Sequence, residues 1–206
     1  ISNAALIGSY DSSSMEKHKL HLGLFLNFEN DTRNNALIPT WGSLVKLRIQ
    51  GYRGMNTVAR SFIQINPEIS IYKALNARRS IILAERLGGG ITIGKTAFYQ
   101  SQFIGGHENL LGYRQYRFAG QHALFNNLEL RIKLADFASY ILPGQFGLTG
   151  FFDIGRVWEP AEESRKWHNG YGGGFYYAPA RMAILQLVAG YSKEGWLPYF
   201  TVGFRF

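Results

Sequence analysis

Alternation of apolar and polar residues with a period of two runs through most of the chain and constrains its fold more than any other feature. Within the clearest runs, nearly every second residue is Leu, Ile, Val or Phe, and the residues between them are mostly polar. Successive side chains of a strand point to opposite faces, so each run predicts a β-strand with one apolar and one polar face. These runs cover residues 17–29, 44–53, 63–71, 123–134 and 198–206.

Weaker alternation predicts further strands at residues 80–87, 147–158, 170–178 and 182–192, and residues 2–10 could supply one more. The total is about ten strands, each near the roughly 9–11 residues that a tilted membrane strand needs. No segment has helical periodicity, and no linker divides the sequence. We therefore expect one all-β domain over residues 1–206.

Two all-β architectures produce such alternation: a soluble sandwich buries its apolar faces, and a membrane barrel turns them to lipid. The mean hydropathy is −0.11, and no apolar run reaches the roughly 18 residues of a spanning helix. Three features favour the barrel. The apolar faces are long and almost purely aliphatic or Phe, opposite charges share polar faces (Glu129 with Arg131 and Lys133), and Trp and Tyr gather near strand ends. The predicted fold is a transmembrane antiparallel up-and-down β-barrel, with a soluble β-sandwich binding module as an alternative.

Other kinds of chemistry find little support in the sequence. The chain has no cysteine, and its +8 formal charge is spread along the chain rather than gathered in one stripe, so we expect no thiolate metal site and no nucleic-acid partner. The segment GGITIGKT at 89–96 matches a phosphate-binding loop, but residues 97–106 after it have no helical apolar stripe and so present no helix N-terminus to a phosphate. We predict no catalytic residue, no metal and no cofactor.

Four segments, in order, resemble the BamA/TamA outer-membrane assembly barrels of the bacterial surface antigen superfamily. Residues 98–120, FYQSQFIGGHENLLGYRQYRFAG, are similar to the inward-folding loop of that family, with its F-Y-x-x-F-x-x-G-G and R-G-[FY] motifs. NDTRNNALIPTWG at 30–42 resembles a family turn, and GFFDIGRVW at 150–158 resembles the F-x-D-x-G-x-V-W strand. The aromatic strand that ends at Phe206 resembles the signal read during membrane assembly, carried by Phe200, Phe204 and Phe206.

The resemblance implies a lock between the loop and the barrel wall. Gly105, Gly106 and Gly112 would allow a tight backbone path inside the lumen. Asp153 shares a strand face with Thr149 and is expected to point inward, where a carboxylate needs a partner. In the family this partner is the arginine of the loop motif. Here Leu111 stands at that position, followed by Gly112 and Tyr113, so Arg114 or Arg117 is expected to replace it.

The resemblance also implies a function and partners. The family barrels usually have about sixteen strands and follow periplasmic POTRA domains, whereas we count about ten strands and no POTRA domain. We expect the C-terminal barrel portion of a longer bacterial outer-membrane protein that assists outer-membrane protein insertion or polypeptide translocation. Its partners would be membrane lipid, lipopolysaccharide, and client proteins or an assembly complex. The alternative is a passive barrel that anchors or exports an upstream domain, such as a hydrolase.

Overall fold

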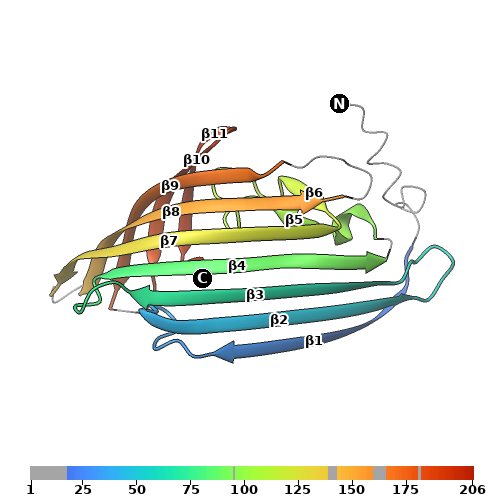
Figure 1. The fold of residues 1–206 in the computed structure, drawn as a ribbon, viewed down its shortest axis with the longest axis horizontal. Coiled ribbons are helices and arrows are strands. Elements are labelled where there is room, and N and C mark those ends of the chain that lie inside the picture. Colours follow the sequence, from blue (N-terminus) through green and yellow to red (C-terminus); the bar gives the residue numbers. More distant parts are fainter. Residues whose placement is uncertain (1–17, 95, 139–142, 160–165, 181) are drawn as a thin grey trace.

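The computed structural model describes residues 18–94, 96–138, 143–159, 166–180 and 182–206. Within these ranges, nine antiparallel strands form a single curved sheet, each paired with its neighbour in sequence apart from the small insertion of β5 and β6 (Figure 1). This is the up-and-down arrangement expected of the barrel, and the predicted strand at residues 2–10 lies outside the described residues. The nine strands are β1 (His21–Asp31), β2 (Trp41–Gly54), β3 (Phe62–Ala74), β4 (Ile81–Gly94), β7 (His122–Phe137), β8 (Gly144–Trp158), β9 (His168–Pro179), β10 (Leu185–Ser192) and β11 (Gly195–Val202).

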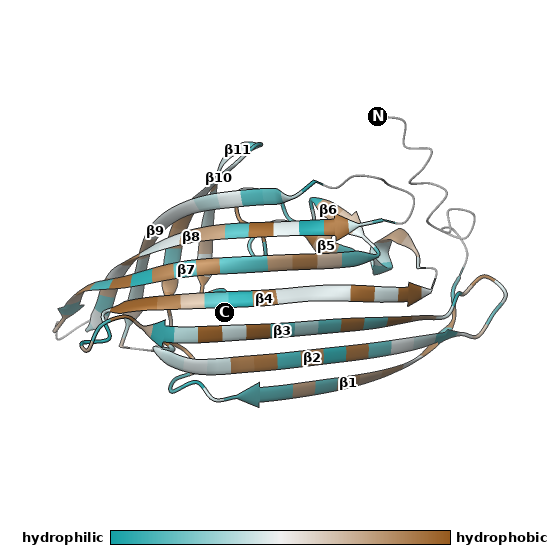
Figure 2. Ribbon diagram, viewed as in Figure 1, coloured by the Kyte–Doolittle hydropathy of each residue, from teal (hydrophilic) through white to brown (hydrophobic). Residues whose placement is uncertain are grey.

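Hydropathy alternates along the strands (Figure 2). Because successive side chains of a strand point to opposite faces, the two faces of the sheet differ. On β7 and β8, Leu128, Leu130 and Phe152 are exposed on the convex face, whereas Glu129 and Asp153 are buried on the concave face. This burial pattern is the reverse of a soluble sandwich, in which the apolar face would lie buried against a second sheet. The sandwich alternative is therefore wrong, and the convex face has the character of a lipid-facing barrel wall.

The strand ends define two ends of the sheet. At one end lie residues 32–40, 75–80, 180 and 182–184, which belong to comparatively short connections between neighbouring strands. The other end carries the long connection between β4 and β7, which includes the 3₁₀ turn η2 (Phe98–Gln100) and the short strands β5 (Gln102–Ile104) and β6 (Phe118–Gly120). We call these the turn end and the loop end. Among the described residues, no helix is long and apolar enough to cross a membrane.

Two predicted boundaries need correction. Residues 89–94 of the segment that resembled a phosphate-binding loop belong to β4, where Gly88–Ile91 pair with β7. At the other boundary, the last strand ends at Val202 rather than at Phe206. Gly203 has φ +101°, a conformation that L residues rarely adopt, and it turns the chain away from the sheet.

Residues 203–206, the terminal segment, therefore run inward instead of extending β11. Phe200 is exposed on the convex face, whereas Phe206 is buried beside Tyr72 of β3 and the guanidinium of Arg86 on β4. The expected common face of Phe200, Phe204 and Phe206 is thus divided between the two sides of the sheet. The ion pairs of Arg205, described below, stabilise this inward turn.

Candidate functional site

The connection from β4 to β7 folds back over the concave face, as the sequence led us to expect of residues 95–120. We call residues 96–121 the lumenal loop. Gly105, Gly106 and Gly112 have φ values of +122°, +85° and +90°. Ile104 and Leu110 pack with Tyr113 in a buried cluster on β7. The loop therefore has a packed core of its own inside the curved sheet.

Asp153 of β8 is the point at which loop, wall and terminal segment meet. Its side chain is fully buried and accepts a hydrogen bond from the backbone N–H of Leu111 at 2.9 Å. Asn127 Nδ2 donates to its other oxygen at 2.8 Å. Arg205 Nη1 lies 2.7 Å from Asp153 Oδ2, and Arg205 Nη2 lies 3.2 Å from Oδ1. A buried carboxylate is stable only with such partners, so Asp153 fixes both segments against the wall.

A second set of contacts fixes the loop from β4 and β7. Asn127 donates to the carbonyl oxygen of Asn109 at 2.8 Å, and Arg86 donates to the carbonyl oxygen of Glu108. Arg86 Nε also donates to Asn127 Oδ1 at 3.0 Å, which fixes the orientation of the amide. Loop backbone carbonyls that would otherwise lack partners are thereby satisfied by the wall.

The far side of the loop approaches β9, β10 and β11 closely. The Tyr199 hydroxyl accepts from the Gly112 N–H at 3.0 Å and donates to the Tyr113 carbonyl at 2.8 Å. A Cβ atom on Gly170 of β9 would lie 1.9 Å from the Leu111 carbonyl oxygen. The loop can take this path only because that strand position has no side chain.

Arg205 links two buried carboxylates. Besides Asp153, it lies 3.4 Å from Glu129 Oε2, and Glu129 Oε1 accepts from Arg131 Nε at 2.7 Å. Arg131 also donates to the Phe206 carbonyl oxygen at 2.9 Å and places its guanidinium 3.7 Å from the centre of the Phe204 ring. All three charged side chains of the Glu129–Arg131–Arg205 group are at most 3% exposed. The terminal segment is thus held by ion pairs and by a cation–π contact.

The partner of Asp153 differs from the one expected. Arg114 is exposed, and Arg117 pairs with Glu194 at 2.5 Å, so neither reaches Asp153. Leu111 contributes its backbone N–H to the carboxylate, while its side chain packs with Phe151 and Val188. Sequence proximity to the motif pointed to the wrong arginine. The cation comes instead from Arg205, 94 residues downstream of Leu111 in sequence.

Burial also shifts the titration of loop residues. It lowers the pKa of His107, with a further lowering from the positive charge of Arg205. It raises the pKa of Tyr113, so the phenol stays protonated. The imidazole Nε2 of His107 is buried without a hydrogen-bond partner among the described residues. Burial therefore disfavours the charged form of His107 in the folded loop.

A cavity of about 550 Å³, lined by several charged residues, separates the loop from β1 and β2. Glu29, Lys46 and Arg48 line it on the strand side, and His107 and Glu108 line it on the loop side. The loop thus fills one part of the concave space and leaves another part open. Within the described parts of the chain, the arrangement offers no converging nucleophile and base, and it is suited to holding a segment in place or releasing it.

Comparisons with known proteins agree with this architecture. A family model described as the Omp85 superfamily domain matches residues 2–193. The crystal structure of BamA from Haemophilus ducreyi lacking POTRA domains 1–3 is similar, with a TM-score of 0.69 and 16% sequence identity. The match covers 88% of this chain and 42% of that one, so the chain spans less than half the length of the solved protein. No curated protein matches the chain.

Proposed function

This chain belongs to the Omp85 superfamily, and from that premise we propose that it serves polypeptide insertion or translocation at the bacterial outer membrane, where it resides. Its work would be conformational rather than covalent. The lumenal loop would be held against the wall in the resting state and released when a polypeptide is handled. The membrane-facing partners would be lipid and lipopolysaccharide, and the protein partners would be client outer-membrane proteins or an assembly complex.

One observation carries this proposal: the Asp153 carboxylate joins the wall, the lumenal loop and the terminal segment through a single buried centre. A barrel that only anchors another domain has no need for a buried charged junction between two folded-in segments. Buried ion pairs often contribute little net stability compared with apolar packing, but they allow a contact to break into two solvated groups. That property suits a contact that opens and closes.

The test uses the intact protein, as expressed from its own gene, reconstituted into phospholipid vesicles. An unfolded eight-stranded outer-membrane barrel is added, and its folding is followed by gel mobility with and without boiling. We expect the vesicles to accelerate folding of the added barrel. We expect Arg205→Gln to change that rate by at least three-fold while the variant itself stays heat-modifiable.

The matched control is Arg48→Gln, which removes one cation from the open side of the cavity; no hydrogen bond or ion pair of Arg48 with the loop or the terminal segment is found among the described residues. It should behave as wild type. Vesicles that give the same folding rate as empty ones would overturn the insertion function and favour the passive anchor. Equal rates for wild type and Arg205→Gln would overturn the role of the junction.

A further inference from the structure

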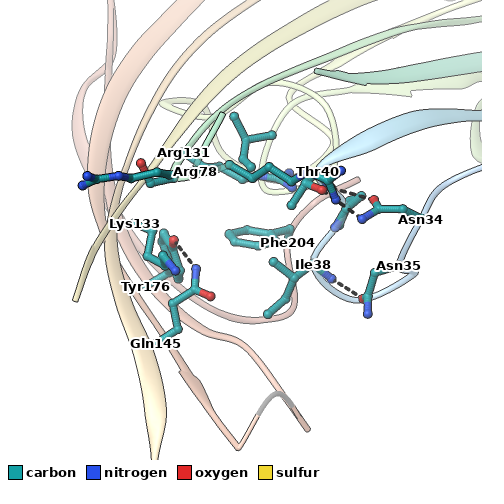
Figure 3. A pocket seen from close by; sticks show the side chains of 14 residues that line it. Asn34, Asn35, Ile38, Thr40, Arg78, Arg131, Lys133, Gln145, Tyr176 and Phe204 are labelled. Atoms are coloured by element: carbon teal, nitrogen blue, oxygen red, sulfur yellow. Dashed lines mark hydrogen bonds between the residues drawn. The ribbon is translucent and has the colours of Figure 1, made fainter. Parts of the chain in front are cut away.

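A second cavity, of about 300 Å³, lies at the turn end of the sheet, away from the lumenal loop. The loop between β1 and β2, the turn between β3 and β4, and side chains of β7, β8 and β9 surround it (Figure 3). Four of its lining residues are cations, and no carboxylate of the described residues lines it. The cations are Arg78, Arg79, Arg131 and Lys133.

Three of these four cations are not fully paired within the described residues. Lys133 is balanced by Asp136 at 3.0 Å. Arg131 uses Nε and Nη2 on Glu129 and Phe206, but its Nη1 is buried with no hydrogen-bond partner among the described residues. A buried guanidinium nitrogen without an acceptor is unfavourable, and an anionic oxygen would satisfy it. Arg78 and Arg79 are exposed at the rim, and no ion pair is found for either in the described parts of the chain.

The backbone at Arg79 adds an independent observation. Its φ is +52°, in the left-handed region that favours glycine or asparagine. The turn is otherwise well formed, with the Arg79 N–H donating to the Asn76 carbonyl at 3.0 Å. The chain therefore carries an arginine at a turn position where a smaller residue would be less strained, and strain of this kind gathers at ligand sites.

The remaining walls limit the ligand. Ile38, Ile82 and Phe204 supply apolar surface, and the Tyr176 hydroxyl is bonded to Gln145 at 2.9 Å. Several arginine forks around one small space suit an anion with three or more oxygens and a double charge, which describes a phosphate monoester better than a lone carboxylate. The volume admits the phosphate and a small organic group, but no macromolecule.

We propose that this turn-end pocket binds a phosphate monoester group, held by Arg131 at the base and by Arg78 and Arg79 at the rim. The same chemistry could be carried by a soluble phosphate compound or by the headgroup of a lipid whose chains stay outside the pocket. One phosphate oxygen supplies the acceptor that Arg131 Nη1 lacks among the described residues.

The experiment measures binding to the intact protein in a neutral detergent by isothermal titration calorimetry. The soluble arm uses inorganic phosphate and glycerol 3-phosphate, and acetate serves as the carboxylate comparator. The lipid arm uses neutral micelles doped with dihexanoyl phosphatidic acid, a short-chain lipid that ends in a phosphate monoester. Saturable binding in the soluble arm identifies a soluble ligand, and saturable binding in the lipid arm alone identifies a headgroup.

The variant is R78Q/R79N, which removes both rim charges and places asparagine where the backbone tolerates it. We expect it to fold as wild type and to bind the phosphate probe roughly ten-fold more weakly, as the loss of two exposed ion pairs implies. The control Arg60→Gln removes a cation at the loop end and should bind as wild type. Equal affinity in R78Q/R79N and wild type, no saturable binding in either arm, or tighter binding of acetate than of phosphate would overturn the proposal.

Discussion

The lumen has two walls that share the same alternating sequence pattern, but the polar side chains are buried on one wall and exposed on the other. On the filled wall (β4, β7, β8 and β9), the polar residues Asn127, Glu129 and Asp153 are buried under the lumenal loop and the terminal segment. On the open wall (β1 and β2), Glu29 and Lys46 face each other across the pair and both remain exposed. Alternation therefore predicts which face meets lipid, but it does not predict whether the polar face is buried or exposed. Burial of the polar face depends on contacts between residues that are distant in sequence.

The largest difference between the two walls is expected in the loss of unfolding free energy when one carboxylate is removed from each wall. Asp153→Ala leaves Arg205 buried with one fewer partner and should lower the free energy of unfolding by about 3–5 kcal/mol. Glu29→Ala, on the open wall, should change it by about 0.5 kcal/mol or less. Chemical unfolding in detergent, followed by tryptophan fluorescence, measures both. Similar losses for the two variants would show that the walls do not differ.

A smaller loss of unfolding free energy is expected when Arg205 is replaced by lysine, which keeps the positive charge but lacks the planar guanidinium group. Arg205→Lys cannot contact Asp153 through two nitrogens and reach Glu129 as well, so we expect a loss of about 1.5–3 kcal/mol. Trypsin should then cut faster after Arg114 and Arg117, which lie in the lumenal loop. Lys46→Arg is the matched exchange on the open wall and should leave the cleavage rate unchanged. An uncut loop in Arg205→Lys would argue that Asp153 alone suffices.

Two glycines test the packing part of the comparison. Gly170→Ala places a methyl group against the Leu111 carbonyl and should cost about 1–3 kcal/mol, since the loop must shift. Gly51→Ala, whose Cβ would lie on the convex face of β2, meets no atom within 4 Å and should be neutral or stabilise by about 0.4–1 kcal/mol. Unfolding midpoints of the two variants provide the measurement. A neutral Gly170→Ala would mean that the loop does not seat against β9.

The smallest expected effect is that of pH on the loop. Because burial and Arg205 lower the pKa of His107, the folded loop favours the neutral imidazole. Stability from this group is present above the ordinary value of about 6.5 and is lost as pH falls through it toward the lower folded value. Trypsin cleavage of the loop, corrected for the pH dependence of trypsin on a denatured control, should rise modestly between about pH 7.5 and about pH 5.5. His107→Gln should show no such rise.

The sequence predicts local features well and distant contacts poorly, for physical reasons. The inward orientation of Asp153 follows from strand geometry, because Phe152 and Ile154 occupy the opposite face. The partner of Asp153 could not be derived in that way, because the alternation of the terminal residues continues past Val202 as if the strand did. Gly203 was the local sign of the turn, and a glycine within a strand pattern is ambiguous. The same ambiguity hid β4 beyond Leu87, where glycines suggested a loop.

The inward terminal segment also implies an order in which the parts of the Asp153 junction come together during folding. Leu111 lies 42 residues before Asp153, and Arg205 lies 52 residues after it, so their junction closes two long loops and carries a high entropic cost before any contact forms. Arg205 follows every described strand of the sheet in sequence, so its arrival is the last of the three. Before β10 and β11 form, the lumenal loop would keep its contacts with Arg86 and Asn127 but lack those of Tyr199, and Asp153 would lack Arg205, so the loop would be held less firmly and be more open to proteases. The junction therefore reports that β10, β11 and the terminal segment have taken their places beside the lumenal loop and β8.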